Sequence, residues 1–334
     1  DAYRQDASDL HIEPYKGKQK TVVRIRKDGT LVHYYDVPAK MSRAVISRIK
    51  IMAGLDISER RKPQDGKIEF QRYSRLPIEL RVSTIPTAGG NEDVTIRILE
   101  SGAPLPLGDL GLSEHNRARL DKVIDMPHGL IFVCGPTGSG KTTTLHSILN
   151  HRNKPETKIW TAEDPIEITQ HGLRQVQVNP KIGFDFAAAL RAFLRADPDI
   201  IMVGEMRDTE TAKIGIEASL TGHLVLTTLH TNSAPESITR LLEMGMDPFS
   251  FQDAMLAVLA QRLTKRLCPD CKRPYMAERD ELMALAHEYL DTASTDDAAE
   301  ALVEGWLKTY GQDGEVRLFE ATGCKACDHS GYRG

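Results

Sequence analysis

Hydrophobic and polar residues alternate in short runs along the first hundred residues, a pattern typical of half-buried β-strands. One run differs, because its apolar residues, among them Met41, Val45 and Ile49, recur at helical spacing. The pattern therefore predicts a small α/β domain over residues 1–100. Its expected elements are a helix at 41–52 and strands at 21–26, 30–35, 67–70, 78–84 and 93–99.

The pattern changes after a stretch rich in proline and glycine at residues 101–108. We place a linker at 101–111, because such residues favour turns. Short apolar strands then alternate with helices, which predicts a parallel sheet covered by helices in a second domain, 112–265, and leaves a C-terminal subdomain at 266–334. The expected strands are 129–134, 159–162, 200–203 and 224–229, and the expected helices are 141–150, 187–196, 208–219 and one capped by Ser113.

Composition narrows the class of protein. A chain of 334 residues is long enough for two domains, and 40% hydrophobic with 27% charged residues is typical of a soluble globular protein. The net charge of −4 gives no general attraction to nucleic acid. No apolar run reaches the ~18–20 residues that cross a bilayer, and the amino end lacks an export signal. Because the first residue is Asp1, we expect a piece of a longer protein, truncated at its end as well.

One segment, Gly135–Thr142, matches the phosphate-loop consensus G-x-x-x-x-G-K-[ST]. It lies between a predicted strand and a predicted helix, which is the context that the motif requires. Such a loop surrounds phosphates with backbone N–H groups, while Lys141 binds the β- and γ-phosphates and the Thr142 hydroxyl binds Mg²⁺. ATP and Mg²⁺ are therefore the expected ligands. The candidate binding residues are Gly135, Pro136, Thr137, Gly138, Ser139, Gly140, Lys141, Thr142 and Thr143.

Carboxylates follow two of the predicted strands of the second domain. Glu163 and Asp164 follow the strand at 159–162, and Glu205 follows the strand at 200–203. Because the carboxyl ends of parallel strands meet at one edge of a sheet, all three are expected near the phosphate loop. Hydrolysis needs a carboxylate to orient water and a group to hold the metal. Taken singly, the alternative for each is a solvated loop carboxylate.

Two histidines, His223 and His230, bracket the strand at 224–229. A histidine at the nucleotide edge of the sheet can sense the γ-phosphate, so both are candidate nucleotide-binding residues. The alternative is a structural hydrogen bond at the strand end, which a single histidine in this position often makes.

Four of the five cysteines form two C-x-x-C pairs, Cys268 with Cys271 and Cys324 with Cys327, while Cys134 stands alone in an apolar strand. Paired knuckles of this spacing are typical of a structural Cys₄ zinc site. An iron–sulfur cluster and disulfides are the alternatives. Cysteines used in this way favour a reducing cytoplasm.

Several motifs, in this order, together resemble the secretion ATPases of the GspE/PilB group. The phosphate loop and residues 161–167, 199–205 and 222–232 are similar to the Walker A motif, Asp box, atypical Walker B motif and His box of that family. Further similar segments are 7–14, 63–66, 207–211 and 260–263.

The resemblance implies a RecA-like core, a small N-terminal domain similar to the family's second one, and a tetracysteine zinc subdomain. It implies a homo-hexameric ATPase of type II secretion or type IV pilus assembly, cytoplasmic at the inner face of the inner membrane. Its partners would be an inner-membrane platform protein and other assembly proteins, through which it would associate with the membrane, without nucleic acid. It also implies that Glu163 activates water and that Glu205 lies near the metal or γ-phosphate, although the reverse assignment stays open.

Arginines of the N-terminal domain fit the same family. Arg24 and Arg26 share one face of an expected strand, and a neighbouring subunit's γ-phosphate is their expected target. A solvated basic strand face is the alternative. The family's second arginine position corresponds here to Lys40 or Arg43.

Two other functions suit the same core. A nucleic-acid helicase or translocase would need stacking aromatic residues and a basic channel, whereas aromatic residues are 6% of the chain. A nucleotide-sensing adaptor would need Glu163 and Glu205 to be catalytically idle.

Overall fold

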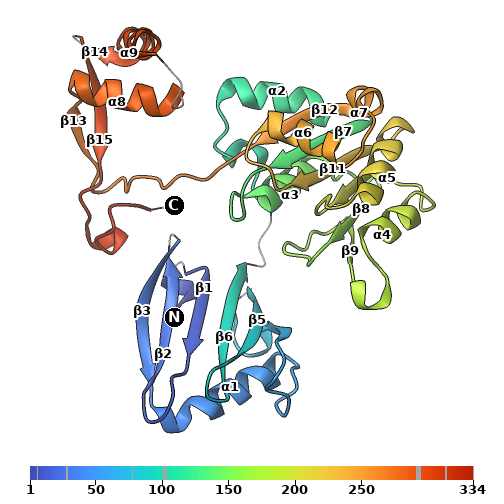
Figure 1. Ribbon diagram of the computed structural model, residues 1–334, viewed down its shortest axis with the longest axis vertical. Helices are drawn as coiled ribbons and strands as arrows, with labels where there is room; N and C mark the ends of the chain where they lie inside the picture. Colours follow the sequence, from blue (N-terminus) through green and yellow to red (C-terminus); the bar gives the residue numbers. More distant parts are fainter. Residues whose placement is uncertain are drawn as a thin grey trace. The chain divides into compact units, whose positions relative to one another are not determined.

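The computed structural model describes residues 1–5, 7–27, 29–76, 78–100, 104–290, 295–312 and 314–333 (Figure 1). The chain forms two compact units, residues 1–263 and 264–334. Among the described residues, none of the helices combines the length and the apolar character that a bilayer crossing requires.

The amino-terminal part of the first unit is a six-stranded antiparallel sheet with the order β3-β2-β1-β6-β5-β4. Its strands are β1 (Asp9–Glu13), β2 (Thr21–Lys27), β3 (Thr30–Val37), β4 (Gln64–Glu69), β5 (Ile78–Thr87) and β6 (Asn91–Glu100). The five predicted strands are confirmed, and β1 was not predicted. The 3₁₀ turns Tyr3–Gln5 and Phe70–Arg72 complete this part.

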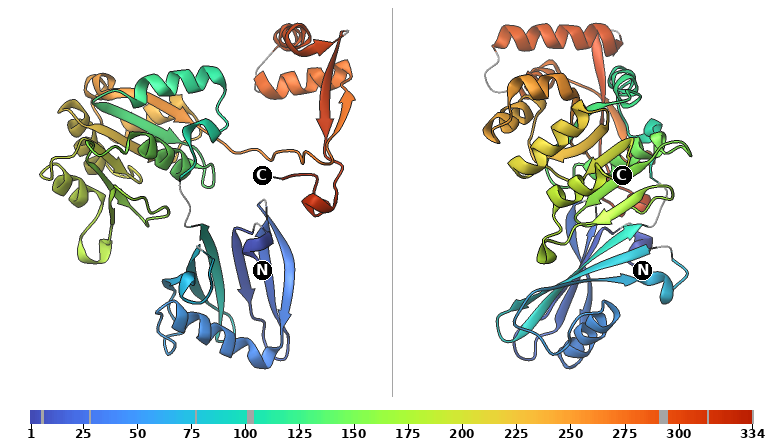
Figure 2. Two further views of the ribbon diagram at one scale, coloured as in Figure 1. Left: turned by 180° about the vertical axis from the view of Figure 1, so that it is seen from behind. Right: turned by 90° about the vertical axis from the view of Figure 1, so that its right-hand side faces the viewer.

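Helix α1 (Ala39–Met52) packs across one face of this sheet (Figures 1 and 2). The predicted helix is confirmed; within it Met41 is half exposed, whereas Ile46 and Lys50 are buried. Lys50 Nζ lies 2.5 Å from Oε1 of Glu92, which is also buried. This ion pair lets a lysine face the core, since each buried charge has its partner.

The remainder of the first unit is built on a six-stranded parallel sheet with the order β12-β7-β11-β10-β8-β9. The strands are β7 (Gly129–Cys134), β8 (Ile159–Glu163), β9 (Arg174–Gln177), β10 (Ile200–Val203), β11 (Leu224–Leu229) and β12 (Met255–Ala260). The four predicted strands are confirmed, while β9 and β12 were not predicted. The predicted linker begins at residues 101–103, which lie outside the described residues.

Alternate side chains of the parallel strands enter two separate cores. Ile131 and Val133 of β7 pack with helices α2 and α3, whereas Leu130 and Phe132 pack on the opposite face with α4, α5, α6 and α7. These helices are α2 (Glu114–Ile124), α3 (Lys141–Arg152), α4 (Phe186–Phe193), α5 (Thr209–Leu220), α6 (Ala234–Glu243) and α7 (Pro248–Ala254). Short 3₁₀ turns occupy Leu107–Asp109 and Pro180–Ile182. Burial on both faces explains why the central strands are continuously apolar.

The second unit contains a three-stranded antiparallel sheet with the order β13-β15-β14. Its elements are β13 (Arg273–Met276), α8 (Arg279–Leu290), α9 (Asp296–Tyr310), β14 (Gly311–Gln312), β15 (Glu315–Glu320) and a 3₁₀ turn at Lys325–Cys327. A small core that includes Leu282, Ala299 and Val303 joins the helices to the sheet. Strands β13 and β15 extend from the helices to the cysteine-bearing loops (Figure 2).

Candidate nucleotide and metal sites

The amino end of α3 differs from the other helix starts of the parallel-sheet domain. Helices α2, α4, α5, α6 and α7 each begin behind a Ser or Asp whose side chain accepts a backbone N–H. Ser113 is the predicted example and is confirmed. Helix α3 instead begins after Gly140 and has no side-chain cap among the described residues. Its first N–H groups therefore need acceptors from elsewhere, and phosphate oxygens are suitable ones.

Glycines determine the path of the loop before α3. Gly135, Gly138 and Gly140 have φ angles of 149°, 80° and 85°, which other L-residues rarely adopt. A Cβ on Gly135 would also lie 2.3 Å from the backbone oxygen of Gln261. The loop is exposed from Pro136 to Gly138 and closes again at the buried Ser139.

Lys141 is held against the loop that precedes it. Its Nζ donates hydrogen bonds to the backbone oxygens of Gly135 at 2.8 Å and Pro136 at 3.0 Å. Burial lowers the pKa of Lys141, while the nearby carboxylate of Glu205 acts to raise it. Thr142 and Thr143 follow in the first turn of α3 and are half buried. The structure thus brings the lysine, both threonines and Glu205 to the carboxyl edge of the sheet.

Glu163 ends β8 and is 3% exposed. One carboxylate oxygen accepts from Thr161 Oγ1 at 2.6 Å and Gln175 Nε2 at 3.0 Å, and the other lies 3.2 Å from His146 Nε2. Gln170 Nε2 lies 2.9 Å from His146 Nδ1, so the imidazole accepts there and donates to the carboxylate. Burial alone would raise the pKa of Glu163, but these donors lower it. Glu163 is therefore an ionised, firmly held carboxylate.

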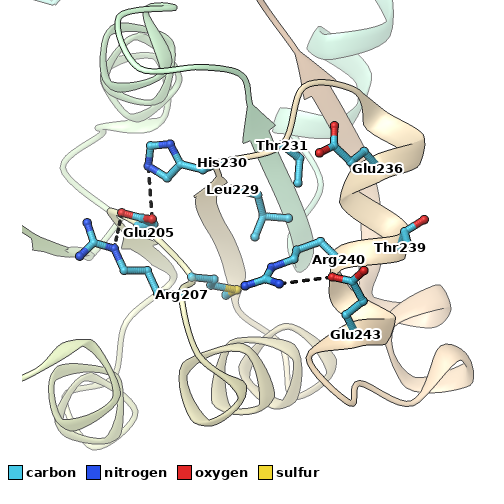
Figure 3. Close-up of a pocket in the computed structure, with 10 residues that line it drawn as sticks. Glu205, Arg207, Leu229, His230, Thr231, Glu236, Thr239, Arg240 and Glu243 are labelled. Atoms are coloured by element: carbon cyan, nitrogen blue, oxygen red, sulfur yellow. Dashed lines mark hydrogen bonds and ion pairs between the residues drawn. The ribbon is translucent and has the colours of Figure 1, made fainter.

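Glu205 lies beyond the end of β10 and is more open than Glu163. Its two carboxylate oxygens pair with His230 Nε2 at 3.2 Å and Arg207 Nε at 2.7 Å (Figure 3). The three residues lie beside a pocket of about 370 Å³ between the strand ends and α6. Its lining residues are Glu205, Met206, Arg207, Leu229, His230, Thr231, Glu236, Thr239, Arg240 and Glu243. The structure therefore brings His230 together with Glu205, as the sequence pattern indicates.

His223 lies at the other end of the same strand. It precedes β11, and its Nδ1 lies 2.9 Å from the backbone oxygen of Ala218 in α5. The structure therefore does not bring His223 to the carboxyl edge where His230 lies. A hydrogen bond to the end of α5 accounts for its position.

Asp164 is exposed beyond β8, in a pocket of about 690 Å³ that contains Arg81 and Arg97. These arginines face each other on β5 and β6. Arg81 donates to the backbone oxygen of Ile166 and lies 3.7 Å from Glu167 Oε1. This pair was not predicted from the sequence, although Arg81 and Arg97 both lie in expected strands, 78–84 and 93–99.

Arg24 and Arg26 have partners within their own domain. Arg24 forms two hydrogen bonds with Glu13, at 2.5 and 2.8 Å, and Arg26 donates to the backbone oxygen of Gly29 at 2.8 Å. Both side chains remain partly exposed. Lys40 and Arg43 are exposed on α1.

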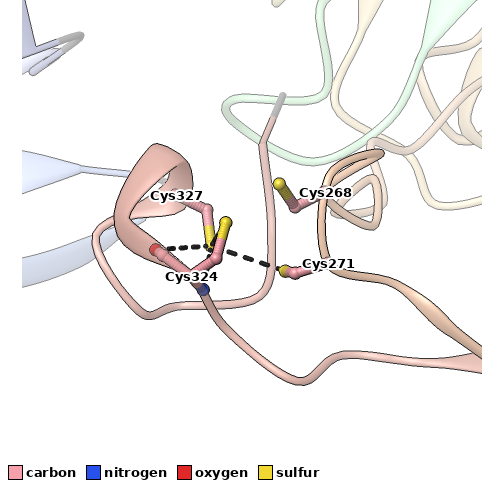
Figure 4. Close-up of side chains that lie close together, drawn as sticks. All are labelled: Cys268, Cys271, Cys324 and Cys327. Atoms are coloured by element: carbon pink, nitrogen blue, oxygen red, sulfur yellow. Dashed lines mark hydrogen bonds between the residues drawn. The ribbon is translucent and has the colours of Figure 1, made fainter.

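The four paired cysteines come together from two loops (Figure 4). The backbone of Cys268 bonds to Gly331, which holds the two knuckles side by side. All four sulfur atoms lie within 4.8 Å of one another. A tetrahedral zinc with Zn–S bonds of ~2.3 Å separates its sulfur ligands by about 3.8 Å. Cys327 Sγ lies 3.8 Å from those of both Cys271 and Cys324, so the set fits zinc.

The acidities of these thiols diverge. Backbone N–H groups point at the sulfur of Cys327 and lower its pKa to about 6. Burial, together with the hydrogen bond to Cys327, raises the pKa of Cys271 to about 11. Four neighbouring thiolates repel one another, so a divalent cation is needed to hold them all deprotonated.

The parallel sheet and its phosphate loop place this chain in the class of RecA-like P-loop folds. The chain belongs to the family described as type II/IV secretion system protein, which it matches over residues 1–334. It is 45% identical over 336 residues to the type II secretion system ATPase E of Vibrio cholerae, and 47% identical over 335 residues to the type IV pilus assembly ATPase PilB of Myxococcus xanthus. Both alignments cover the whole of this chain. They cover 61% of the Vibrio cholerae protein and 55% of the Myxococcus xanthus protein, so the chain spans only part of the length of these relatives.

Solved structures agree with the fold. The pilus retraction motor PilT with bound ADP is 28% identical and superposes with a TM-score of 0.63, covering 80% of this chain and 78% of that one. The ATPase DotB of Legionella pneumophila, at 23% identity, shares the fold with a TM-score of 0.62, covering 94% of this chain and 87% of that one. The predicted family and fold class are thereby confirmed.

Proposed function

We propose that this chain is the ATP-hydrolysing part of a motor for type II protein secretion or type IV pilus assembly. One observation carries the proposal: Lys141 is held against a glycine-shaped phosphate loop at the uncapped amino end of α3. The named relatives support the choice of process, since they are a type II secretion ATPase and a type IV pilus assembly ATPase. The two branches share these features, so both remain within the proposal.

The roles of the residues follow from their positions. The loop amides and Lys141 would bind the phosphates of ATP, and Thr142 would hold Mg²⁺, whose charge offsets that of the phosphates. Glu163 uses three of the roughly four acceptor positions of a carboxylate. The remaining one can orient a water molecule, and we assign this role to Glu163. Glu205, which is less buried than Glu163 and lies beyond the end of the neighbouring strand β10, is assigned to the metal and γ-phosphate.

We extend the proposal to the assembly. By resemblance to the family, the working form is a homo-hexamer at the cytoplasmic face of the inner membrane, bound to a platform protein. An arginine from a neighbouring subunit would stabilise the transferring phosphate, and Arg24 and Arg26 remain the proposed donors. Zn²⁺ is the proposed metal of the four cysteines, where it would fix the two loops and supply no chemistry.

The test is ATP turnover by the wild type, Lys141→Ala and the matched surface variant Lys213→Ala, whose lysine is exposed on α5. We expect turnover in the wild type and Lys213→Ala and none above background in Lys141→Ala. Single-stranded DNA should not stimulate it. Equal turnover in all three proteins would overturn the proposal, and strong stimulation by DNA would favour a translocase.

A further inference from the structure

The segment that follows β12 lies directly against the phosphate loop. Gln261 donates its backbone N–H to Cys134 O, at the end of β7, at 2.9 Å. Its own backbone oxygen occupies the space where a Cβ of Gly135 would lie. The backbone of Gln261 thus fixes the first residue of the loop.

The side chain of Gln261 reaches the other end of the loop. Its Nε2 donates to the backbone oxygen of Ser139 at 2.6 Å, and its Oε1 accepts from Thr144 Oγ1 at 2.8 Å. The two bonds fix the amide orientation, because the flipped amide would place an oxygen against the carbonyl of Ser139. Thr144 is itself buried in the first turn of α3. One glutamine therefore connects the start of the loop, its end and the helix that follows.

We infer that Gln261 is a positioning residue for nucleotide binding, which it serves by holding the phosphate loop in its binding conformation. The inference rests on the proposed function, since it supposes that the loop binds nucleotide phosphate. The loop crest from Pro136 to Gly138 is exposed, so its shape depends on how its two ends are held. A ligand that needs several N–H groups aimed at one point loses affinity when their orientation spreads.

The mode of action predicts how kinetic constants change. Loop amides contact the phosphates in the ground state and in the transition state alike, so losing their alignment should raise KM more than it lowers kcat. A residue that only filled space beside the loop would instead change thermal stability, and an isosteric replacement would restore it. Gln261→Glu separates these cases, because it keeps the shape but turns a carboxylate oxygen toward Ser139 O.

The experiment compares Gln261→Ala, Gln261→Glu and Thr144→Val with Gln252→Ala, an exposed glutamine of α7 that serves as the matched control. ADP affinity is measured by titration calorimetry, alongside KM, kcat and Tm. We expect Gln261→Ala to weaken ADP binding about tenfold, Gln261→Glu by more, and Thr144→Val about threefold. Gln252→Ala should bind as the wild type does. The double variant of Gln261→Ala and Thr144→Val should be no weaker than Gln261→Ala alone.

Two results would overturn the inference. One is an ADP affinity of Gln261→Ala within twofold of that of Gln252→Ala. The other is wild-type affinity in Gln261→Glu. If Gln261→Ala does not fold, the ADP affinity of Thr144→Val is the deciding measurement. An affinity equal to that of the wild type would then overturn the inference. Wild-type protein that binds no ADP would instead refute the proposed function, whereas binding that is lost in Lys141→Ala but kept in Gln261→Ala would refute only the positioning role.

Discussion

The phosphate loop and the cysteine cluster are both short loop sites, but they are held in different ways. The loop lies between a strand buried on both faces and a helix, and Gln261 and Lys141 bind its backbone oxygens. The cysteine loops are held by backbone bonds and by the sulfur atoms themselves, beside a small core. We therefore expect the first site to keep its shape without a ligand and the second to depend on a cation.

The difference shows what each ligand would do for the protein. At the phosphate loop a nucleotide would accept hydrogen bonds from N–H groups that the fold already presents. At the cysteines a metal ion would offset the repulsion among neighbouring thiolates, two of which have shifted pKa values, about 6 for Cys327 and about 11 for Cys271. Nucleotide binding is thus expected to change activity, and metal binding to change folding.

The largest expected effect is that of metal removal on the second unit. Structural zinc contributes on the order of 10 kcal/mol in small zinc domains, so a chelator or Cys324→Ser should unfold residues 264–333 locally. Hydrogen exchange should show fast exchange there, while nucleotide affinity of the first unit changes less than about twofold. If hydrogen exchange in the second unit stayed unchanged after verified loss of the metal, the cysteine loops would not depend on a cation, and the contrast with the phosphate loop would be wrong.

Next in size is the loss of either carboxylate at the nucleotide edge. Glu163→Gln and Glu205→Gln should each reduce ATP turnover by about 10²–10⁴-fold. Glu163→Gln should keep its affinity for the Mg²⁺ complex, whereas Glu205→Gln should change the Mg²⁺ dependence of binding. Turnover assays and Mg²⁺ titrations of binding measure these effects. A changed Mg²⁺ dependence in Glu163→Gln and not in Glu205→Gln would exchange the roles assigned to the two carboxylates.

A smaller effect concerns acid stability. The fold lowers the pKa of Glu163 below its ordinary value of 4.5, so ionised Glu163 stabilises the protein above that pH, and this contribution is lost as pH falls through the lowered pKa. The Tm of the wild type should therefore exceed that of Glu163→Gln at pH 6, and the gap should narrow toward pH 3. Thermal unfolding at several pH values measures it, and a gap independent of pH would contradict the assignment.

The smallest effect sharpens the contrast between capped and uncapped helices. Ser113→Ala removes the hydrogen bond that caps α2 and should cost about 1 kcal/mol of stability. Because the buried residues of α2, Leu120 and Ile124, pack in the hydrophobic core and not against the exposed loop residues, ADP affinity should not change. Chemical denaturation and calorimetry test this pair of outcomes, and a loss of affinity would show that the loop is less independent than its contacts indicate.

Sequence alone predicted those parts of the molecule that depend on local pattern. The strands 129–134, 200–203 and 224–229 were predicted with their observed bounds, because strands buried on both faces are continuous apolar runs. The polar edge strand β9 and the strand β12 were missed. Tertiary pairing, which no local pattern records, decides that residues such as those of β9 form a strand.

The candidate sites also contain features that a local sequence pattern predicts and features that only tertiary contacts determine. The phosphate loop and the cysteine pairs each have a fixed local spacing, which predicts them from the sequence alone. The bond of His146 to Glu163 and those of Gln261 to the loop join segments 17 and 122 residues apart, so no spacing revealed them. Lys50 was missed for a related reason, since its burial depends on Glu92 on another element.

The most direct test is binding of a slowly hydrolysed ATP analogue with Mg²⁺, followed by calorimetry in the wild type and in Lys141→Ala. The account predicts a one-to-one complex in the wild type and at least a hundredfold weaker binding, about 2.7 kcal/mol, in the variant. Equal heats from the two folded proteins, or none from either, would contradict it.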